Sequence, residues 1–253
     1  TVRALASDLG VSPATVSHAW QTLSANGLIL SRGRSGSVVR SAPRDWLPLR
    51  YRGMDGEAGA RLTAELARSR IEKAAAGIRD FYVCSLSCRS IIYKGMMLAE
   101  AVSIFYPDLQ DPRFVSAFAI YHQRYSTNTF PRWWLAQPFR MLAHNGEINT
   151  LKGNLNWLKS HEIRMSSDYF GELAEDIKPI VLPGSSDSAA LDNVFEVLVR
   201  AGRIAPMAKS MLVPEAWSKL ATKMPQAWQD MYAYSNAVME PWDGPAALAM
   251  TDG

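Results

Sequence analysis

The sequence has 253 residues, 48% of them hydrophobic and 20% charged, with two cysteines and a net charge of +3. This composition is ordinary for a folded globular protein, and the length suits one large domain or two smaller ones. Two cysteines cannot form a disulfide scaffold. No apolar run approaches the ~18 residues that span a bilayer, and no signal peptide opens the chain. We therefore expect a cytoplasmic protein with no membrane contact.

The first predicted elements are two helices joined by a tight turn. The stretch "VRALASDLG" places apolar residues on one helical face, and Gly10 is suited to end that helix. Ser12 is a good N-cap, and Pro13 takes the favoured first position of a second helix, "PATVSHAWQTLSA". The following "LILSRGRSGSVVR" predicts two short strands around a loop rich in Arg, Gly and Ser.

This region predicts a DNA-binding helix-turn-helix, with a plain helical hairpin as the alternative. Residues 1–61 hold eight Arg, no Lys and four acids, which gives +4, whereas the remaining 19 basic and 20 acidic side chains give −1. A basic segment favours a polyanionic partner. The side chains expected to face a DNA groove are small and polar, and two arginines on the loop are expected to reach phosphates: Ser12, Ala14, Thr15, Ser17, His18, Arg32 and Arg34.

The stretch "LASDLGVSPATVSHAWQTLSANGLILSRGRSGSVV" closely resembles the winged helix-turn-helix of GntR-type bacterial regulators, which implies DNA as the partner of residues 1–40. Two features depart from that family. Its first helix is missing before Thr1, and no pyridoxal-phosphate domain follows, so we do not expect that cofactor. Residues 41–61, rich in Pro and Gly, are interpreted as a linker.

The rest of the chain mixes predicted helices and strands. We expect a helix from Leu62, a strand, a break and a second strand over residues 80–95, and a buried strand or helix over 113–126. A helix is predicted over 187–202, with Asp187 or Ser188 as its N-cap, an apolar stripe and Gly202 at its end; the stripe is Leu191, Val194, Phe195 and Leu198. The final "ALAMTDG" predicts a strand and a turn, and both ends of the chain look cut.

Three polar features suggest a binding site. Arg124 can clamp a carboxylate through two parallel hydrogen bonds, or form a structural ion pair. Asn145 and Gly146 can donate to an oxyanion, although Asn-Gly is also a strong signal for a tight hairpin turn. Asp187 can accept hydrogen bonds from an ammonium group or act as a helix cap. Together these groups suit an amino acid with a reactive side-chain carbonyl, such as glutamine.

Long motifs in the second half closely resemble the large subunit of glutamate synthase: "DFYVCSLSCRSIIYKGM", "HQRYSTNTFPRWWLAQPFRMLAHNGEINTLKGN", "PGSSDSAALDN" and "MEPWDGPAALAMTDG". The resemblance covers residues 62–253 and concerns the type-2 glutamine amidotransferase domain. It implies an α+β Ntn-hydrolase fold, with two stacked antiparallel sheets between helices (αββα). It also implies that Arg124 holds the glutamine α-carboxylate, Asn145 and Gly146 form the oxyanion hole, Asp187 binds the α-amino group, and Thr127 lines the pocket.

The family's nucleophile is a cysteine at the mature N-terminus whose own amine acts as the base. No such residue is present here, and Cys84 and Cys88 match ordinary family positions, so we expect no glutamine hydrolysis. The family also uses FMN and a 3Fe–4S cluster in other domains and pairs with a small subunit. Two cysteines cannot supply the three thiolates of that cluster, and the histidines lack metal-ligand spacing, so we expect no metal or cofactor in this chain.

Three hypotheses follow. In the first, the chain joins part of a regulator to part of a glutamate synthase at about residues 61–62 and is catalytically inactive. In the second, it is a DNA-binding transcriptional regulator whose second domain senses glutamine. In the third, it is a folded interaction module with neither activity. We prefer the first, because natural fusions usually join whole domains and here both partners are broken.

Overall fold

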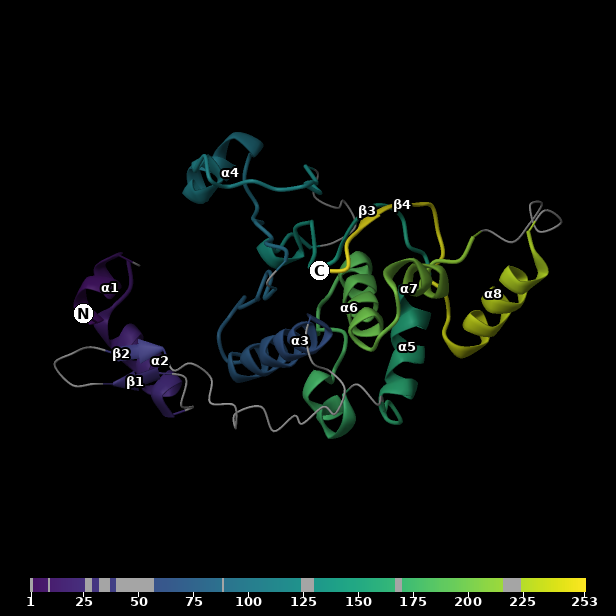
Figure 1. The fold of residues 1–253 in the computed structure, drawn as a ribbon, viewed down its shortest axis with the longest axis horizontal. Coiled ribbons are helices and arrows are strands. Elements are labelled where there is room, and N and C mark those ends of the chain that lie inside the picture. Colours follow the sequence, from purple (N-terminus) through teal and green to yellow (C-terminus); the bar gives the residue numbers. More distant parts are fainter. Residues whose placement is uncertain are drawn as a thin grey trace. The chain divides into compact units, whose positions relative to one another are not determined.

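A computed structural model describes residues 2–8, 10–25, 29–31, 37–39, 57–87, 89–123, 130–166, 170–215 and 224–253. The chain forms two compact units, residues 1–53 and residues 54–253. Figure 1 shows the elements of both units along the chain. No helix among the described residues is long and apolar enough to cross a membrane.

The first unit contains two helices and a short hairpin. Helix α1 (Val2–Asp8) is followed by α2 (Pro13–Ala25), and strand β1 (Ile29–Ser31) pairs antiparallel with β2 (Ser37–Val39). Ser12 caps α2, because its Oγ accepts a hydrogen bond from the Thr15 N–H at 3.1 Å. Gly10 adopts a φ of +64°, which glycine tolerates best. A helix pair and a hairpin occur in unrelated folds, so these elements alone do not establish a winged helix-turn-helix.

The second unit begins with α3 (Glu57–Ala74), five residues before the predicted start at Leu62. The linker prediction was wrong for residues 57–61, since this stretch is rich in Ala, Glu and Arg and contains no Pro to stop a helix. The helix buries Leu62 and Leu66. It packs on the short helix η5 (Gly171–Ile177), where Ser69 Oγ donates to the Asp176 carbonyl at 2.6 Å.

The strand predictions for residues 80–95 were wrong wherever the structure describes these residues, and the buried strand or helix predicted over 113–126 is absent from its described part, residues 113–123. Backbone N–H groups in the first segment bond to side chains instead of a neighbouring strand: Val83 N–H donates to Glu72 Oε1 at 3.1 Å, and Ile92 N–H to Ser85 Oγ at 3.2 Å. Residues 113–123 are irregular, and Val115 is 85% exposed. An apolar run becomes a buried strand only where a partner covers it. Between these segments lie α4 (Ala99–Phe105) and η3 (Pro107–Gln110).

The sheet of the second unit is a pair of strands far apart in the sequence. Strand β3 (Leu142–Gly146) pairs antiparallel with β4 (Ala246–Met250), with Leu142 opposite Met250 and Gly146 opposite Ala246. Strand β4 confirms the strand predicted from "ALAMTDG". The expected αββα sandwich does not appear in the described part of this unit, where β3 and β4 form one two-stranded sheet. The segment 80–95, predicted to supply further strands, bonds to side chains instead.

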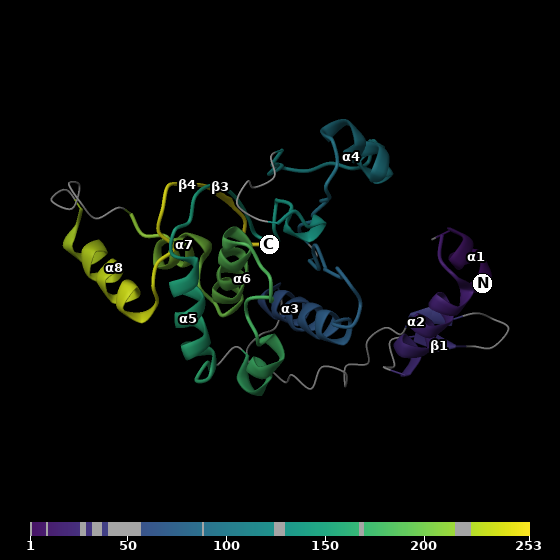
Figure 2. The same ribbon diagram turned by 180° about the vertical axis from the view of Figure 1, so that it is seen from behind.

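The remaining helices surround a core centred on α6 (Asp187–Arg200), which Figures 1 and 2 show between α3 and α7. The others are η4 (Trp133–Leu135), α5 (Leu151–Glu162), α7 (Ala205–Leu212) and α8 (Gln226–Val238). The predicted apolar stripe of α6 is confirmed, since Leu191, Val194 and Phe195 are at most 3% exposed and Leu198 packs against the core. Gly202 ends the helix with a φ of +92°, as predicted.

Candidate functional site

Asn145 and Gly146 are the last two residues of strand β3, and both are exposed. The hairpin-turn interpretation of Asn-Gly is wrong, because Asn145 lies opposite Ala247 of the distant strand β4. Position 146 requires glycine for a packing reason. A Cβ there would clash with the Pro245 carbonyl oxygen and lie 2.8 Å from His144 Nε2.

Asp187 is the first residue of α6 and does not cap it. The N-cap is Ser186, whose side chain accepts a hydrogen bond from the Ala189 N–H at 3.2 Å, so the prediction of Asp187 or Ser188 as cap was wrong. The Ser186 hydroxyl, one residue before Asp187, satisfies an N–H group of the first helical turn. Asp187 Oδ1 accepts the Ser188 N–H at 2.7 Å and the Ser188 hydroxyl at 3.3 Å. Its carboxylate is half-buried and therefore retains access to an ammonium group.

One side-chain contact joins these two parts of the site. His144 Nδ1 lies 2.8 Å from Ser188 Oγ, which links the residue before Asn145 to the residue after Asp187. The His144 side chain is buried, and burial lowers the pKa of its imidazole, which keeps the ring neutral at neutral pH. The structure therefore brings Asn145, Gly146 and Asp187 into one region.

Helix α6 fixes the start of β3 through a second contact. Asp192 is 1% exposed, and its carboxylate accepts three successive backbone N–H groups, from Arg140 at 3.2 Å, Met141 at 2.9 Å and Leu142 at 3.0 Å. Ser188, Asp192 and Glu196 are spaced by four residues and share one face of α6. This buried polar face holds the strand that ends at Asn145 and Gly146.

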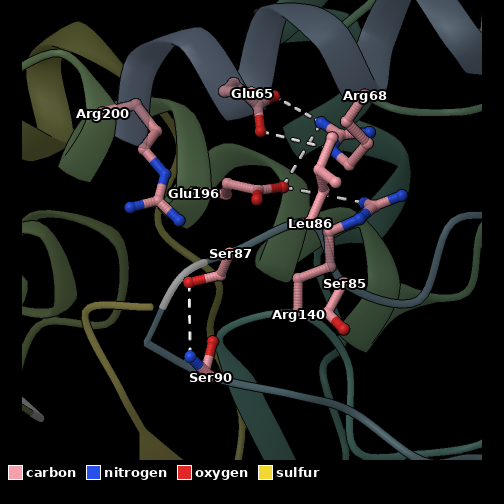
Figure 3. A pocket seen from close by; sticks show the side chains of 9 residues that line it. All are labelled: Glu65, Arg68, Ser85, Leu86, Ser87, Ser90, Arg140, Glu196 and Arg200. Carbon is pink, nitrogen blue, oxygen red and sulfur yellow. Dashed lines mark hydrogen bonds and ion pairs between the residues drawn. The ribbon is translucent and has the colours of Figure 1, made fainter. Parts of the chain in front are cut away.

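Glu196 belongs to a buried ion cluster between α3 and α6. Arg68 lies 2.5 Å from Glu72 and 3.4 Å from Glu196 and also pairs with Glu65, while Arg140 lies 2.7 Å from Glu72 and 3.6 Å from Glu196. Figure 3 shows four of these charged groups pointing toward one another: Glu65, Arg68, Arg140 and Glu196. The cluster ties both helices to Arg140, which lies two residues before β3.

The charged groups of this cluster shift one another's pKa values. Burial raises the pKa of Glu65 to about 7, with the nearby charge of Glu196 adding to the rise. Burial would also raise the pKa of Glu196, but Arg68 and Arg140 outweigh burial and lower it. Burial would lower the pKa of the Arg68 guanidinium, but the surrounding carboxylates outweigh that effect and raise it.

Two cavities among the described residues of the second unit lie away from the predicted site. The one drawn in Figure 3, of about 10 Å³, is lined by the ion cluster and three serines and holds a single water at most. A larger one of about 240 Å³ lies between α3, residues 177–183 and α6. Asn145, Gly146 and Asp187 line neither cavity, and we place the site by their chemistry because enclosed volume alone identifies no ligand.

Cys84 does not have the environment of a nucleophile. Its thiol is half-buried, and burial raises its pKa, so the thiol form dominates at neutral pH. Lys94 is buried in contact with two aromatic rings, Tyr82 and Phe139, and burial lowers its pKa to about 8, but its ammonium donates to the Trp134 carbonyl at 2.8 Å. No group of three or more metal-ligating side chains occurs within the described ranges.

Several predicted site residues lie outside the described residues, namely Arg124, Thr127, Arg32 and Arg34, and so does Cys88, which was not expected to be catalytic. In the first unit, the other residues predicted to contact DNA lie at or near the start of α2. Four of them are exposed and Ser17 is half-buried; the exposed ones are Ser12, Ala14, Thr15 and His18.

The sequence reasoning did not identify the residues that connect the site, namely Gln137, His144, Ser188 and Asp192. For two of them, Ser188 and Asp192, a signal was available. Together with Glu196 they are polar residues at a spacing of four on one helix, which is typical of a polar face. Gln137 gave no such signal.

Comparison with known proteins identifies relatives of the second unit. The profile of the family "Glutamine amidotransferases class-II" matches residues 56–253. The glutamate synthase [NADPH] large chain of Azospirillum brasilense is 66% identical over 190 residues, covering 74% of this chain and 12% of that protein.

Two further relatives carry related names. The glutamate synthase [NADPH] large chain of Bacillus subtilis (strain 168) is 51% identical over 174 residues, covering 69% of this chain and 11% of that protein. The chloroplastic ferredoxin-dependent glutamate synthase of Spinacia oleracea is 50% identical over 194 residues, covering 74% of this chain and 12% of that protein. The chain thus spans about an eighth of the length of these curated relatives. From residue 56 onward, this chain belongs to the class-II glutamine amidotransferases.

Proposed function

We propose that the second unit binds L-glutamine and is part of a glutamate synthase large chain, in which glutamine hydrolysis supplies ammonia for glutamate synthesis. The family match and the names of the relatives support the substrate class. The observation that carries the proposal is the 2.8 Å contact between His144 and Ser188, because it links the end of strand β3, where Asn145 and Gly146 lie, to the start of α6, where the half-buried Asp187 lies.

Each group of the site has a chemical task in this proposal. The Asp187 carboxylate accepts hydrogen bonds from the glutamine α-ammonium. The Asn145 side-chain amide and the Gly146 N–H donate to the amide oxygen of glutamine, where negative charge develops when a nucleophile adds to the carbonyl carbon. Arg124 clamps the α-carboxylate and Thr127 lines the pocket, two roles that rest on their positions in the sequence motif.

We further propose that a polypeptide of these 253 residues binds glutamine without hydrolysing it. Hydrolysis needs a nucleophile activated by a base, and the raised pKa of the Cys84 thiol leaves little thiolate at neutral pH. Cys88 lies four residues further along the same segment and matches no nucleophile position. A glutaminase assay should therefore show no turnover. Ammonia release that persists in the Cys84→Ala and Cys88→Ala variants, but not in Asp187→Ala, would refute this.

Binding is tested by isothermal titration calorimetry on the full chain. L-Glutamine should bind saturably, D-glutamine should bind much more weakly, and Asp187→Ala should weaken L-glutamine binding at least tenfold, because it removes a charge-assisted hydrogen bond. Asp230→Ala is a matched control, since Asp230 lies on α8 and bonds to Gln226. The proposal fails if the folded wild-type chain gives no heat with L-glutamine, or if both aspartate variants behave alike.

A second proposal concerns the first unit alone. We propose that residues 1–40 bind DNA, with the exposed polar residues at the start of α2 facing a groove and Arg32 and Arg34 meeting phosphates. The tight turn at Gly10 and the capped start of α2 support it. Fluorescence anisotropy with a duplex pool at rising salt tests it. Binding should weaken steeply with salt and decrease further in Arg32→Ala and Arg34→Ala, and the absence of binding at low salt would rule it out.

A further inference from the structure

The His144 side chain lies where the two halves of the proposed site meet. It is 3% exposed, and its Nδ1 is 2.8 Å from Ser188 Oγ. Ser188, 5% exposed, is in turn 3.3 Å from Asp187 Oδ1. A continuous line of side-chain contacts therefore runs from the carboxylate that opens α6 to the residue next to Asn145.

Chemistry fixes the direction of the hydrogen bonds along this line. A carboxylate only accepts hydrogen bonds, so the Ser188 hydroxyl donates its one hydrogen to Asp187. The Ser188 oxygen is then left as the acceptor for His144, and the imidazole must carry its hydrogen on Nδ1. The neutral ring that burial favours is compatible with this tautomer.

The backbone of His144 is also held by two hydrogen bonds. The Gln137 side chain donates from Nε2 to the His144 carbonyl at 2.8 Å and accepts the His144 N–H through Oε1 at 2.6 Å. On the other side of the ring, His144 Nε2 lies against the position that a Cβ of residue 146 would occupy. The imidazole therefore occupies the side of the strand end on which residue 146 has no side chain.

We propose that Ser188 and His144 are positioning residues that couple the ammonium-binding carboxylate to the oxyanion-binding strand end. They touch no substrate. They hold Asp187 at one distance from Asn145 and Gly146, so that one glutamine molecule meets both groups at once. This inference rests on the proposed glutamine site and deepens it.

The coupling predicts a specific pattern of affinities for L-glutamine, measured by calorimetry on the full chain. Ser188→Ala and His144→Ala should each weaken binding about tenfold, since each breaks the same buried contact. The double variant should bind no more weakly than either single variant, because the two residues act as one unit. His144→Asn should restore binding to within about threefold, because its amide nitrogen is attached where Nδ1 is. His161→Ala, at an exposed histidine on α5, and Ser235→Ala, at a buried serine on α8, are matched controls expected to bind normally.

A spectroscopic measurement distinguishes positioning from mere folding. The ¹⁵N shifts of the imidazole nitrogens, recorded on the full chain without glutamine, should show the Nδ1–H tautomer in the wild type. Asp187→Ala frees the Ser188 hydroxyl to donate toward Nδ1, so the Nε2–H tautomer should replace it, as it should in Ser188→Ala.

The two readouts separate the inference from the function on which it rests. If the chain does not bind glutamine but Asp187→Ala still changes the tautomer, the proposed function is wrong and the hydrogen-bonded link is supported. If glutamine binds, but Ser188→Ala changes neither the affinity nor the tautomer, the positioning role is overturned while the function stands. Additive losses in the double variant would also overturn it.

Discussion

Glu65→Gln should remove one contribution to the pH dependence of stability in the second unit. The Glu65 carboxyl is 3% exposed, and burial together with the charge of Glu196 raises its pKa from 4.5 to about 7. An acid whose pKa is higher in the folded state stabilises the fold while protonated, and this contribution is lost as pH rises from about 4.5 through 7. The shift corresponds to about 3 kcal/mol of unfolding free energy, at about 1.4 kcal/mol per pKa unit.

Urea unfolding at pH 5 and pH 8, followed by circular dichroism, measures this contribution. The wild type should lose about 3 kcal/mol more than Glu65→Gln between the two pH values, because glutamine mimics the protonated carboxyl and does not titrate. Glu175→Gln is the control, since the Glu175 side chain is 76% exposed and forms only a surface pair with Lys178. Equal pH dependence in the wild type and Glu65→Gln would show that Glu65 is ionised in the fold and refute the reasoning.

Three further results are expected. Gly146→Ala should abolish glutamine binding, because its Cβ would clash with the Pro245 carbonyl, whereas Gly153→Ala on α5 should bind normally, because only the end of a glutamate side chain must move; equal affinities would contradict the packing described here. Asp192→Ala should lower the free energy of unfolding by about 3–5 kcal/mol, since three buried N–H groups lose their acceptor. A decrease below about 1 kcal/mol in urea unfolding would contradict this prediction. In a Cys88→Ser background, Cys84 should react slowly with iodoacetamide at pH 7 and faster above pH 9, because burial raises the pKa of its thiol; fast labelling at pH 7 would argue against it.

Local rules predicted helix α6 well because its signals are contained within the helix itself. The apolar stripe and the terminal Gly202 were correct. The cap was placed one or two residues late, since Ser186, Asp187 and Ser188 all suit that role and only the backbone conformation decides between them. The strand pair was harder to predict, because β3 and β4 are about a hundred residues apart. The Asn-Gly signal indicates a turn between neighbouring strands and carries no information about a distant partner strand.

The site was predictable as chemistry but not as geometry. Asn145, Gly146 and Asp187 were selected for the hydrogen bonds that they can make, and the structure links the segments that carry them through the contact between His144 and Ser188. His144 and Ser188, which connect them, were not selected, because a buried histidine and a serine near a helix start are common and their contact spans 44 residues. Apolar runs suggested strands at 80–95 and a buried strand or helix at 113–126, yet the burial of such a run depends on partners that local patterns do not reveal.

The most direct test of a glutamine site is an NMR titration of the ¹⁵N-labelled chain with L-glutamine. The Gly146 backbone N–H and the Asn145 side-chain amide should shift together and saturate at one concentration, and both shifts should disappear in Asp187→Ala. Saturable shifts located elsewhere in the chain, or no shifts in a folded chain, would contradict the site described here.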